Sequence, residues 1–112
     1  MSEFAILAHK TRLDCTKTPV YRGDGTKAAR PNVDIVIDKK TGLVKPEKTG
    51  LSVHLDQQKL LKRFSTAPRI KSIPDELQII QQGKDPGHCG IGPKQPMTPE
   101  RFQELLNLVE FE

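Results

Sequence analysis

Proline and glycine interrupt this chain so often that only short helices and strands fit between them. The 112 residues include nine Pro and eight Gly, and both residue types mark turns and chain breaks. The hydrophobic fraction is 35%, with no Trp, one Tyr and four Phe, which is typical of a small domain rich in turns. Because 112 residues fall inside the usual range for one domain, we expect residues 1–112 to form a single domain around one core.

The C-terminal segment gives the clearest secondary-structure signal. Thr98 is a good N-cap and Pro99 suits the first helical position. Apolar residues then recur at the spacing of one helical face. The sequence therefore predicts a helix whose buried stripe consists of Phe102, Leu105, Leu106 and Val109.

Weaker sequence patterns predict the secondary structure of most of the remaining chain. A second helix is predicted from Asp56 to about Phe64, with Asp56 as its cap and Leu60, Leu61 and Phe64 on one face. The KKTG stretch predicts a hairpin turn between Ile37 and Leu43. Alternating or extended patterns predict strands at 19–22, 33–37, 50–55, 69–73, 77–82 and 88–93.

This order of elements predicts an α+β fold. Strands, a helix, further strands and a final helix follow one another along the chain. The first fifteen residues are open at this level, because Phe4–Leu7 fits the start of a strand or of a helix equally well.

The apolar runs and the cysteines of the sequence indicate the location and the redox state to expect. No apolar run approaches the roughly 20 residues of a membrane helix, and the apolar patch near Met1 is too short for a signal peptide. Two cysteines, Cys15 and Cys89, are too few to indicate a disulfide framework. We therefore expect free thiols, a cytoplasmic location and no contact with a membrane.

The net charge permits an anionic partner without requiring one. Lys and Arg number 18 against 14 Asp and Glu, which gives +4. No block of five like charges occurs, so an ordinary solvated surface also explains the excess.

Several common chemistries are excluded by spacing. The glycines around Lys27 do not form a phosphate-binding loop, and those at 87–92 are too few for a dinucleotide fingerprint. A Cys-His nucleophile pair at His88 and Cys89 is disfavoured, because neighbouring strand residues point to opposite faces. No metal is expected, because the potential ligands show no paired spacing: His9, Cys15, His54, His88 and Cys89.

Three polar residues stand out in otherwise apolar, extended settings. Arg22 ends an early strand, Ser52 lies inside a predicted strand and His88 begins a late one. Each has an ordinary explanation: a surface ion pair for Arg22, the solvated face of a strand for Ser52, and a loop position for His88. Taken together they predict one cleft, which only the pairing of strands could assemble, since 30 and 36 positions separate them.

The order of short motifs resembles the ADP-ribosyltransferase-like toxins, especially the small type VI secretion effectors of bacteria. The resemblance covers most of the chain from Val20 to Leu108. It rests on Tyr21-Arg22, Arg30-Pro31, Gly42 to Pro46, Gly50-Leu51-Ser52-Val53, Ile73-Pro74 with Leu77 to Ile80, His88 to Pro93, and Met97 with the helix around Phe102 and Leu105-Leu106.

The resemblance implies an NAD cleft between two small antiparallel sheets. Arg22, with Tyr21 beside it, would bind a phosphate or ribose oxygen, and Ser52 would brace that arginine or the nicotinamide ribose. His88 would contact the ribose or accept a proton near the scissile bond. The expected activity is ADP-ribosyl transfer or NAD hydrolysis, with His88 and Ser52 as catalytic residues and a neutralising immunity or antitoxin protein as a partner.

The sequence also departs from this pattern. Transferases of this fold commonly need a late carboxylate, yet the stretch 88–95 contains none, and the nearest are Asp85 and Glu100. Cys89 stands where an aromatic residue often follows the histidine. The alternative function is therefore a non-catalytic binding module that holds a protein or nucleic acid through its basic surface. Nucleic acid stays open, although no aromatic residue is visibly interleaved with the basic ones.

Overall fold

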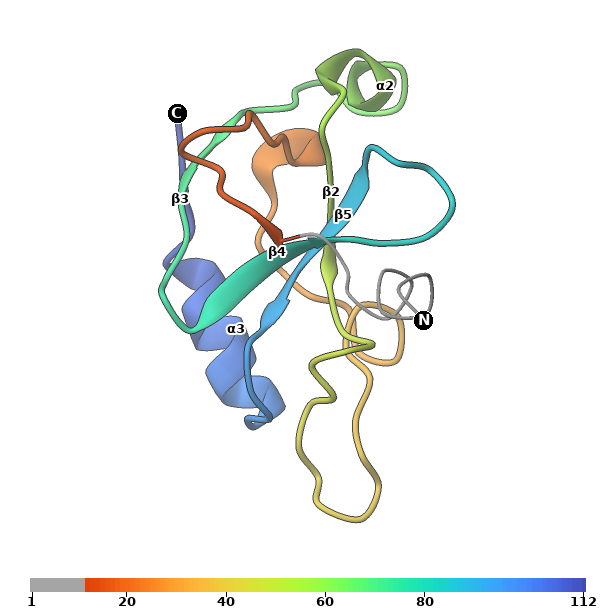
Figure 1. Cartoon of the computed structure of the whole chain (residues 1–112), viewed down its shortest axis with the longest axis vertical. Helices are drawn as coiled ribbons and strands as arrows, with labels where there is room; N and C mark the ends of the chain where they lie inside the picture. The colour runs from red at the N-terminus through yellow and green to blue at the C-terminus, as the bar shows by residue number, and fades with distance from the viewer. Residues whose placement is uncertain (1–11) are drawn as a thin grey trace, which may run out of the picture.

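Two antiparallel sheets and a C-terminal helix organise residues 12–112, which are the residues that this computed structural model describes (Figure 1). The segment Phe4–Leu7 lies outside them. The larger sheet has the strand order β1-β4-β5-β2 and the smaller one pairs β3 with β6. The fold is α+β with few helices, as predicted. The strands are β1 (Arg12–Leu13), β2 (Leu51–His54), β3 (Ile70–Ser72), β4 (Leu77–Gln81), β5 (His88–Pro93) and β6 (Glu110–Phe111).

The pairing of β2 with β5 divides its side chains between two environments. Ser52 lies opposite Gly90 and His54 lies opposite His88. Because side chains alternate along a strand, these residues share one face of the sheet. The residues that alternate with them point to the other face and belong to the hydrophobic core: Leu51, Val53, Cys89 and Ile91.

Helix α3 (Pro99–Asn107) completes that core. The Thr98 hydroxyl accepts a hydrogen bond from the Arg101 backbone N–H at 3.1 Å, so the helix begins where its cap predicts. Phe102, Leu105 and Leu106 are buried in the same apolar cluster as the strand residues. The predicted amphipathic helix is confirmed, except that it ends at Asn107, so that the buried Val109 follows it. Among the helices of residues 12–112, none is long and apolar enough to cross a membrane.

Helix α2 (Gln57–Leu61) is shorter and more exposed than predicted. Asp56 caps it, because its carboxylate accepts from the Gln58 backbone N–H at 3.0 Å. No residue of α2 is buried, and Leu61 is 40% exposed. The apolar face predicted for Leu60, Leu61 and Phe64 therefore does not enter the core. Leu60 and Phe64 instead line a cavity.

The strand predicted at 33–37 is reduced to single bridges at Ile35 and Ile37, and its first residues form a turn. The backbone N–H groups of Val33, Asp34 and Ile35 all donate to the Arg30 carbonyl, which makes a turn. Asn32 has a positive φ of 64° at its centre, and Val33 is 61% exposed. The predicted KKTG turn does form, since the Gly42 N–H donates to the Asp38 carbonyl at 2.7 Å. The predicted strand at 19–22 is reduced to single bridges at Tyr21.

We predict that Leu105→Ala and Leu106→Ala each lower the free energy of unfolding by about 2 to 5 kcal/mol, because both side chains are fully buried. Leu108→Ala is the matched control, since Leu108 is 62% exposed, and it should change the stability by less than about 0.5 kcal/mol. Urea titrations of the three variants give the comparison. Equal losses at buried and exposed positions would contradict this packing of α3.

Both cysteines are buried and unbridged, as predicted. Burial raises the pKa of the Cys15 thiol, and burial together with the charge of Asp85 raises the pKa of Cys89 to about 11. We predict that neither thiol reacts with a disulfide reagent at pH 8 in the folded protein, whereas both react after denaturation. Rapid labelling of either thiol under native conditions would refute the prediction.

Candidate functional site

A cavity of about 790 Å³ opens on the polar side of the β2–β5 pair, and this volume lies in the range of small-molecule sites. Strands β2 and β5 contribute one wall. The other wall comes from α2 and the residues after it, and the segment 22–30 closes the end. The lining residues are Arg22, Arg30, Ser52, Val53, His54, Lys59, Leu60, Lys62, Arg63, Phe64, Asp85 and His88.

Ser52 and His88 form a hydrogen-bonded pair in this cavity. The Ser52 hydroxyl lies 3.0 Å from Nε2 of His88, and Nδ1 of His88 lies 3.3 Å from the Gln82 carbonyl oxygen. A carbonyl only accepts hydrogen bonds, so Nδ1 carries the proton and donates. In the neutral imidazole Nε2 is then the unprotonated nitrogen, and it accepts from the Ser52 hydroxyl. In this tautomer His88 presents a base to the cavity.

The β4–β5 hairpin fixes the ring of His88. The Gln82 N–H donates to the His88 carbonyl at 2.9 Å, which places the Gln82 carbonyl beside the ring. Gly83 turns the chain with a φ of 74°, a conformation that side chains with a Cβ rarely adopt. Gly90 leaves room for the Gln82 side chain, which a Cβ there would approach to 2.5 Å.

Arg22 closes the end of the cavity and also ties the fold together. Its guanidinium donates to the Ser52 carbonyl at 2.9 Å and to both oxygens of Thr26, at 3.0 and 2.8 Å. These three bonds leave two of the five N–H groups of the guanidinium without a partner among residues 12–112. Burial lowers the pKa of Arg22, but an arginine stays charged in a protein. A planar pair of free donors suits a phosphate or carboxylate.

These contacts decide which substitution of Arg22 can test a ligand role. An arginine that serves only a ligand could be replaced by Ala with little effect on stability. Arg22→Ala would instead leave the half-buried Ser52 carbonyl without its donor, at a cost of about 1 to 3 kcal/mol. Arg22 is thus a fold contact as well as a candidate ligand contact, and Arg22→Lys is the milder probe of its forked donors.

Asp85 lies at the mouth of the cavity and is held by three donors. One oxygen accepts from Nε2 of His54 at 2.9 Å and from Lys59 at 3.2 Å, and the other accepts from the Gly87 N–H at 2.9 Å. Nδ1 of His54 accepts from the Asp56 N–H at 2.8 Å, so its proton is on Nε2. The bonds from His54, Gly87 and Lys59 hold the pKa of Asp85 well below its usual range. The loop before β5 therefore carries a carboxylate that is ionised at neutral pH.

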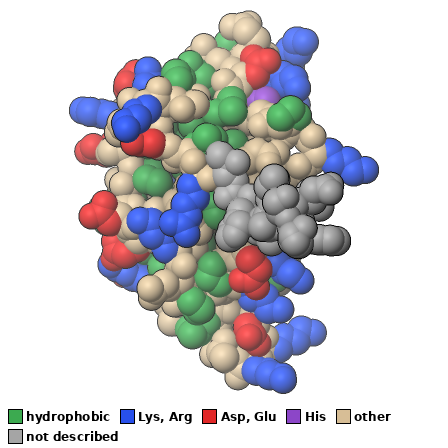
Figure 2. Space-filling view, in the orientation of Figure 1, with side chains coloured by type: hydrophobic (Ala, Val, Ile, Leu, Met, Phe, Trp, Pro, Cys, Tyr) green, Lys and Arg blue, Asp and Glu red, His purple; other side chains and the backbone are tan. Residues whose placement is uncertain are grey.

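The basic excess of the chain is concentrated at this cavity. Five of its lining residues are Lys or Arg and one is Asp, a formal charge of +4. This equals the net charge of the whole chain, so the other 13 basic and 13 acidic residues cancel. Accordingly, Lys and Arg on the face seen in Figure 2 are interspersed with Asp and Glu.

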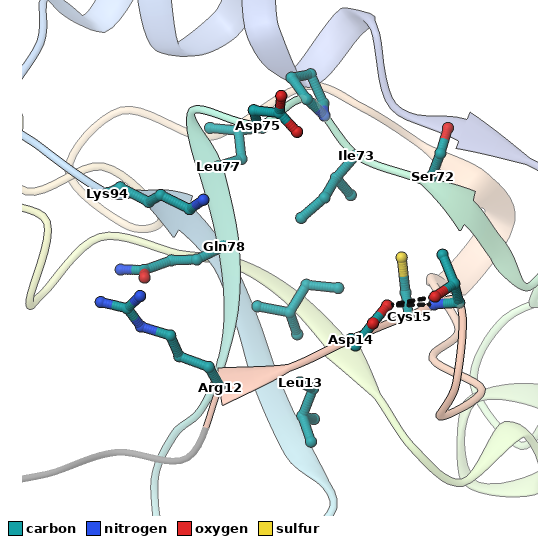
Figure 3. Close-up of a pocket in the computed structure, with 13 residues that line it drawn as sticks. Arg12, Leu13, Asp14, Cys15, Ser72, Ile73, Asp75, Leu77, Gln78 and Lys94 are labelled. Atoms are coloured by element: carbon teal, nitrogen blue, oxygen red, sulfur yellow. Dashed lines mark hydrogen bonds between the residues drawn. The ribbon is translucent and has the colours of Figure 1, made fainter.

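A second cavity, of about 400 Å³, lies beside β1 and β4 (Figure 3). Arg12 and Lys94 are balanced there by Asp14 and Asp75, so its lining has no net formal charge. Asp14 is engaged by the backbone and hydroxyl of Thr16. This cavity has no hydrogen-bonded nucleophile and base, and the first cavity is the candidate site.

The structure brings together three of the four residues that the sequence predicts at the site. Arg22, Ser52 and His88 line one cavity, which confirms their predicted proximity and leaves their roles open. Tyr21 is not among the lining residues. Its backbone instead exchanges two hydrogen bonds with His54.

Sequence reasoning missed two other members of the site. His54 lies two positions after Ser52, and that spacing in a strand already predicts a shared face. Asp85 offers no such signal, because a loop brings it to the cavity. Glu100, the other carboxylate considered from the sequence, is exposed in the first turn of α3 and does not line this cavity.

Among residues 12–112, no group of three or more His, Cys, Asp and Glu side chains is arranged to hold a metal ion. Comparisons of the chain with models of known protein families, with curated proteins and with solved structures find no match. The functional argument therefore rests on the residues of the cavity and their geometry.

We predict that Asp85→Asn reduces the loss of stability in acid. The folded-state pKa of Asp85 is lowered, so its contribution is present above the ordinary carboxylate range and is lost as the pH falls below about 4. The variant should be less stable than the wild type at pH 7, and the difference should shrink toward pH 3. Glu47→Gln, at an exposed residue outside the ion pairs of the described structure, is the control. Parallel stability curves for the wild type and Asp85→Asn in urea titrations would contradict this role.

Proposed function

We propose that the protein is an NAD-using enzyme of the ADP-ribosyltransferase-like toxin type, acting as a transferase or as an NAD glycohydrolase in the bacterial cytoplasm. The observation that carries the proposal is the hydrogen-bonded Ser52–His88 pair beside the two free donors of Arg22, inside one basic cavity. The two small antiparallel sheets are compatible with this fold.

In this proposal Arg22 binds the pyrophosphate of NAD. Its two free N–H groups match two phosphate oxygens, and its charge is partly desolvated, which strengthens the attraction to an anion. The Ser52 carbonyl and Thr26 hold the guanidinium in a fixed plane. The arginine therefore loses little side-chain freedom when it binds.

Ser52 and His88 then act at the nicotinamide ribose. The bond between ribose C1′ and the nicotinamide nitrogen breaks, and its electron pair leaves with nicotinamide, which departs neutral. A hydroxyl or amine of the acceptor, or water, forms the new bond to C1′. Its proton passes to Nε2 of His88, which the Gln82 carbonyl holds in the accepting tautomer. Ser52 orients the ribose by its hydroxyl.

Asp85 supplies the negative charge that the segment 88–95 lacks. It is the one carboxylate among the residues that line the cavity, and its three donors keep it ionised. A carboxylate near C1′ would stabilise the positive charge that develops as nicotinamide departs. Because Lys59 and His54 also bind that carboxylate, we expect it to stabilise the positive charge at C1′ less than an unpaired carboxylate would.

A second candidate function is a non-catalytic binding module of the same kind. The observation in its favour is that Arg22 already serves the fold through three hydrogen bonds. In that case the cavity would bind an anionic partner without turnover. Under the enzyme proposal a neutralising protein would cover the cavity and keep NAD out.

The proposal is tested by nicotinamide release from NAD. We expect the wild type to release nicotinamide and His88→Asn to lose at least about 100-fold in rate, as for removal of a general base. The Asn amide can still donate to the Gln82 carbonyl, while the group facing Ser52 is gone. Ser52→Ala should lose activity as well, with the fold intact by circular dichroism. A wild type without turnover, with and without candidate acceptors, would leave only the binding module.

Binding is measured separately by thermal shift. NAD at 100 times its dissociation constant should raise the wild-type free energy of unfolding by about 2.7 kcal/mol. Arg22→Lys should retain the fold and lose most of this gain, because an ammonium lacks the forked donors. Lys39→Gln, at the exposed hairpin turn outside the cavity, should keep the full gain. Equal gains in all three proteins would remove Arg22 from the NAD site.

A further inference from the structure

We propose that the acceptor bound by this cavity is a single-stranded nucleic acid, whose phosphates are held by the basic mouth next to α2. The inference rests on the proposed function, in which the strand receives the ADP-ribosyl group, and it adds the class of macromolecule that the cavity takes. Charge, unpaired cations and the shape of the site carry it.

The charge distribution points to a polyanion. The cavity lining carries a formal +4, whereas the rest of the chain is balanced and the second cavity is neutral. A polyanion would therefore be drawn to this cavity and not to the surface in general. One NAD pyrophosphate at Arg22 leaves the cations at the mouth available for a second anionic ligand.

Two cations at the mouth have no acidic partner in the part of the chain that the structure describes. Lys59 is paired with Asp85 at 3.2 Å and Arg30 with Asp34 at 3.3 Å. Lys62 and Arg63 follow α2, are exposed, and form no ion pair among residues 12–112. Neighbouring free cations at the edge of a concave site match the repeating charge of a phosphate backbone.

An aromatic residue accompanies these cations. Phe64 lines the same cavity, and the Arg63 guanidinium lies 5.8 Å from the centre of its ring. On the Gly23 side the ring is packed so closely that a Cβ at Gly23 would lie 2.4 Å from it. An unstacked base is bound by stacking on aromatic or guanidinium planes, and this pair offers such a platform. An acidic protein segment would satisfy the charges but would make no use of the platform.

The concave shape selects a single strand. Ser52 and His88 lie inside the cavity, whereas the unpaired cations lie at its mouth. A duplex keeps its bases stacked, and an enzyme reaches them only in a single strand or after flipping one out. A single strand can place one nucleotide in the cavity while its neighbouring phosphates stay at the mouth. A hydroxyl or amine of that nucleotide forms the bond to C1′ as nicotinamide leaves, and its proton passes to His88.

The test compares two matched double variants. Lys62→Gln with Arg63→Gln removes the free cations at the mouth, and Lys39→Gln with Lys40→Gln removes the same charge at the exposed hairpin turn, at the far end of the molecule from α2 (Figure 1). Binding of a fluorescent 12-nucleotide single-stranded oligonucleotide is measured by anisotropy between 50 and 200 mM salt. The slope of log affinity against log salt should become shallower by about 1.4 in the mouth variant and by less than half of this in the turn variant.

Three further measurements complete the test. A duplex of the same length and poly-glutamate should both bind the wild type more weakly than the single strand does. Equal loss in the two double variants, or tighter binding of duplex or poly-glutamate, would overturn the inference. The NAD-dependent thermal shift, measured without oligonucleotide, should be the same in the mouth variant and the wild type. If the wild type lacks the NAD-dependent shift but binds the oligonucleotide through Lys62 and Arg63, the proposed NAD-using function is contradicted and the nucleic-acid site is retained.

Discussion

The register of β2 against β5 is the constraint on which both the core and the cavity depend. With Ser52 opposite Gly90 and His54 opposite His88, one face of the pair is apolar and the other is polar. A slip of one residue in either strand would exchange its two faces. Cys89 would then reach the cavity and His88 the core, where no partner for its ring is available. The burial of Leu51, Val53 and Ile91 against α3 thus also fixes the place of Ser52 and His88.

The sequence predicts those helices and strands whose bounds are determined by their own residues. Strand β5 has the predicted bounds, and α3 begins at its Thr98 cap, because capping and periodicity are local properties. The segment 33–37 has an alternating pattern as well. However, the Arg30 carbonyl accepts hydrogen bonds from its first three backbone N–H groups, and the backbone N–H and guanidinium of Arg30 bind the Asp34 carboxylate. Alternation alone does not reveal how far a strand pairs, and here the turn takes the first residues while Ile37 makes a single antiparallel bridge to Val44.

Local sequence patterns predicted some residues of the candidate site, whereas others depend on tertiary contacts. Arg22, Ser52 and His88 were recognisable as polar residues in extended segments, and the β2–β5 pairing brings the last two together. Asp85 was recognisable only as a carboxylate near the segment 88–95, because its place at the cavity depends on the loop between β4 and β5 and on donors from His54, Lys59 and Gly87. Local pattern therefore identifies the strand residues of the cavity, while the charged residues at its mouth require the tertiary structure.

Arg22 joins the fold and the candidate site in one side chain. The three oxygens that it binds lie on Thr26 and Ser52, so the guanidinium links the loop at Thr26 to strand β2 at the end of the cavity. Five basic residues around a cavity with a single carboxylate repel one another, and burial lowers the pKa of the most enclosed of them. Hydrogen bonds to neutral oxygens hold Arg22 there without cancelling its charge. Under the proposed function, the phosphate groups of an anionic ligand would reduce this repulsion between the basic side chains.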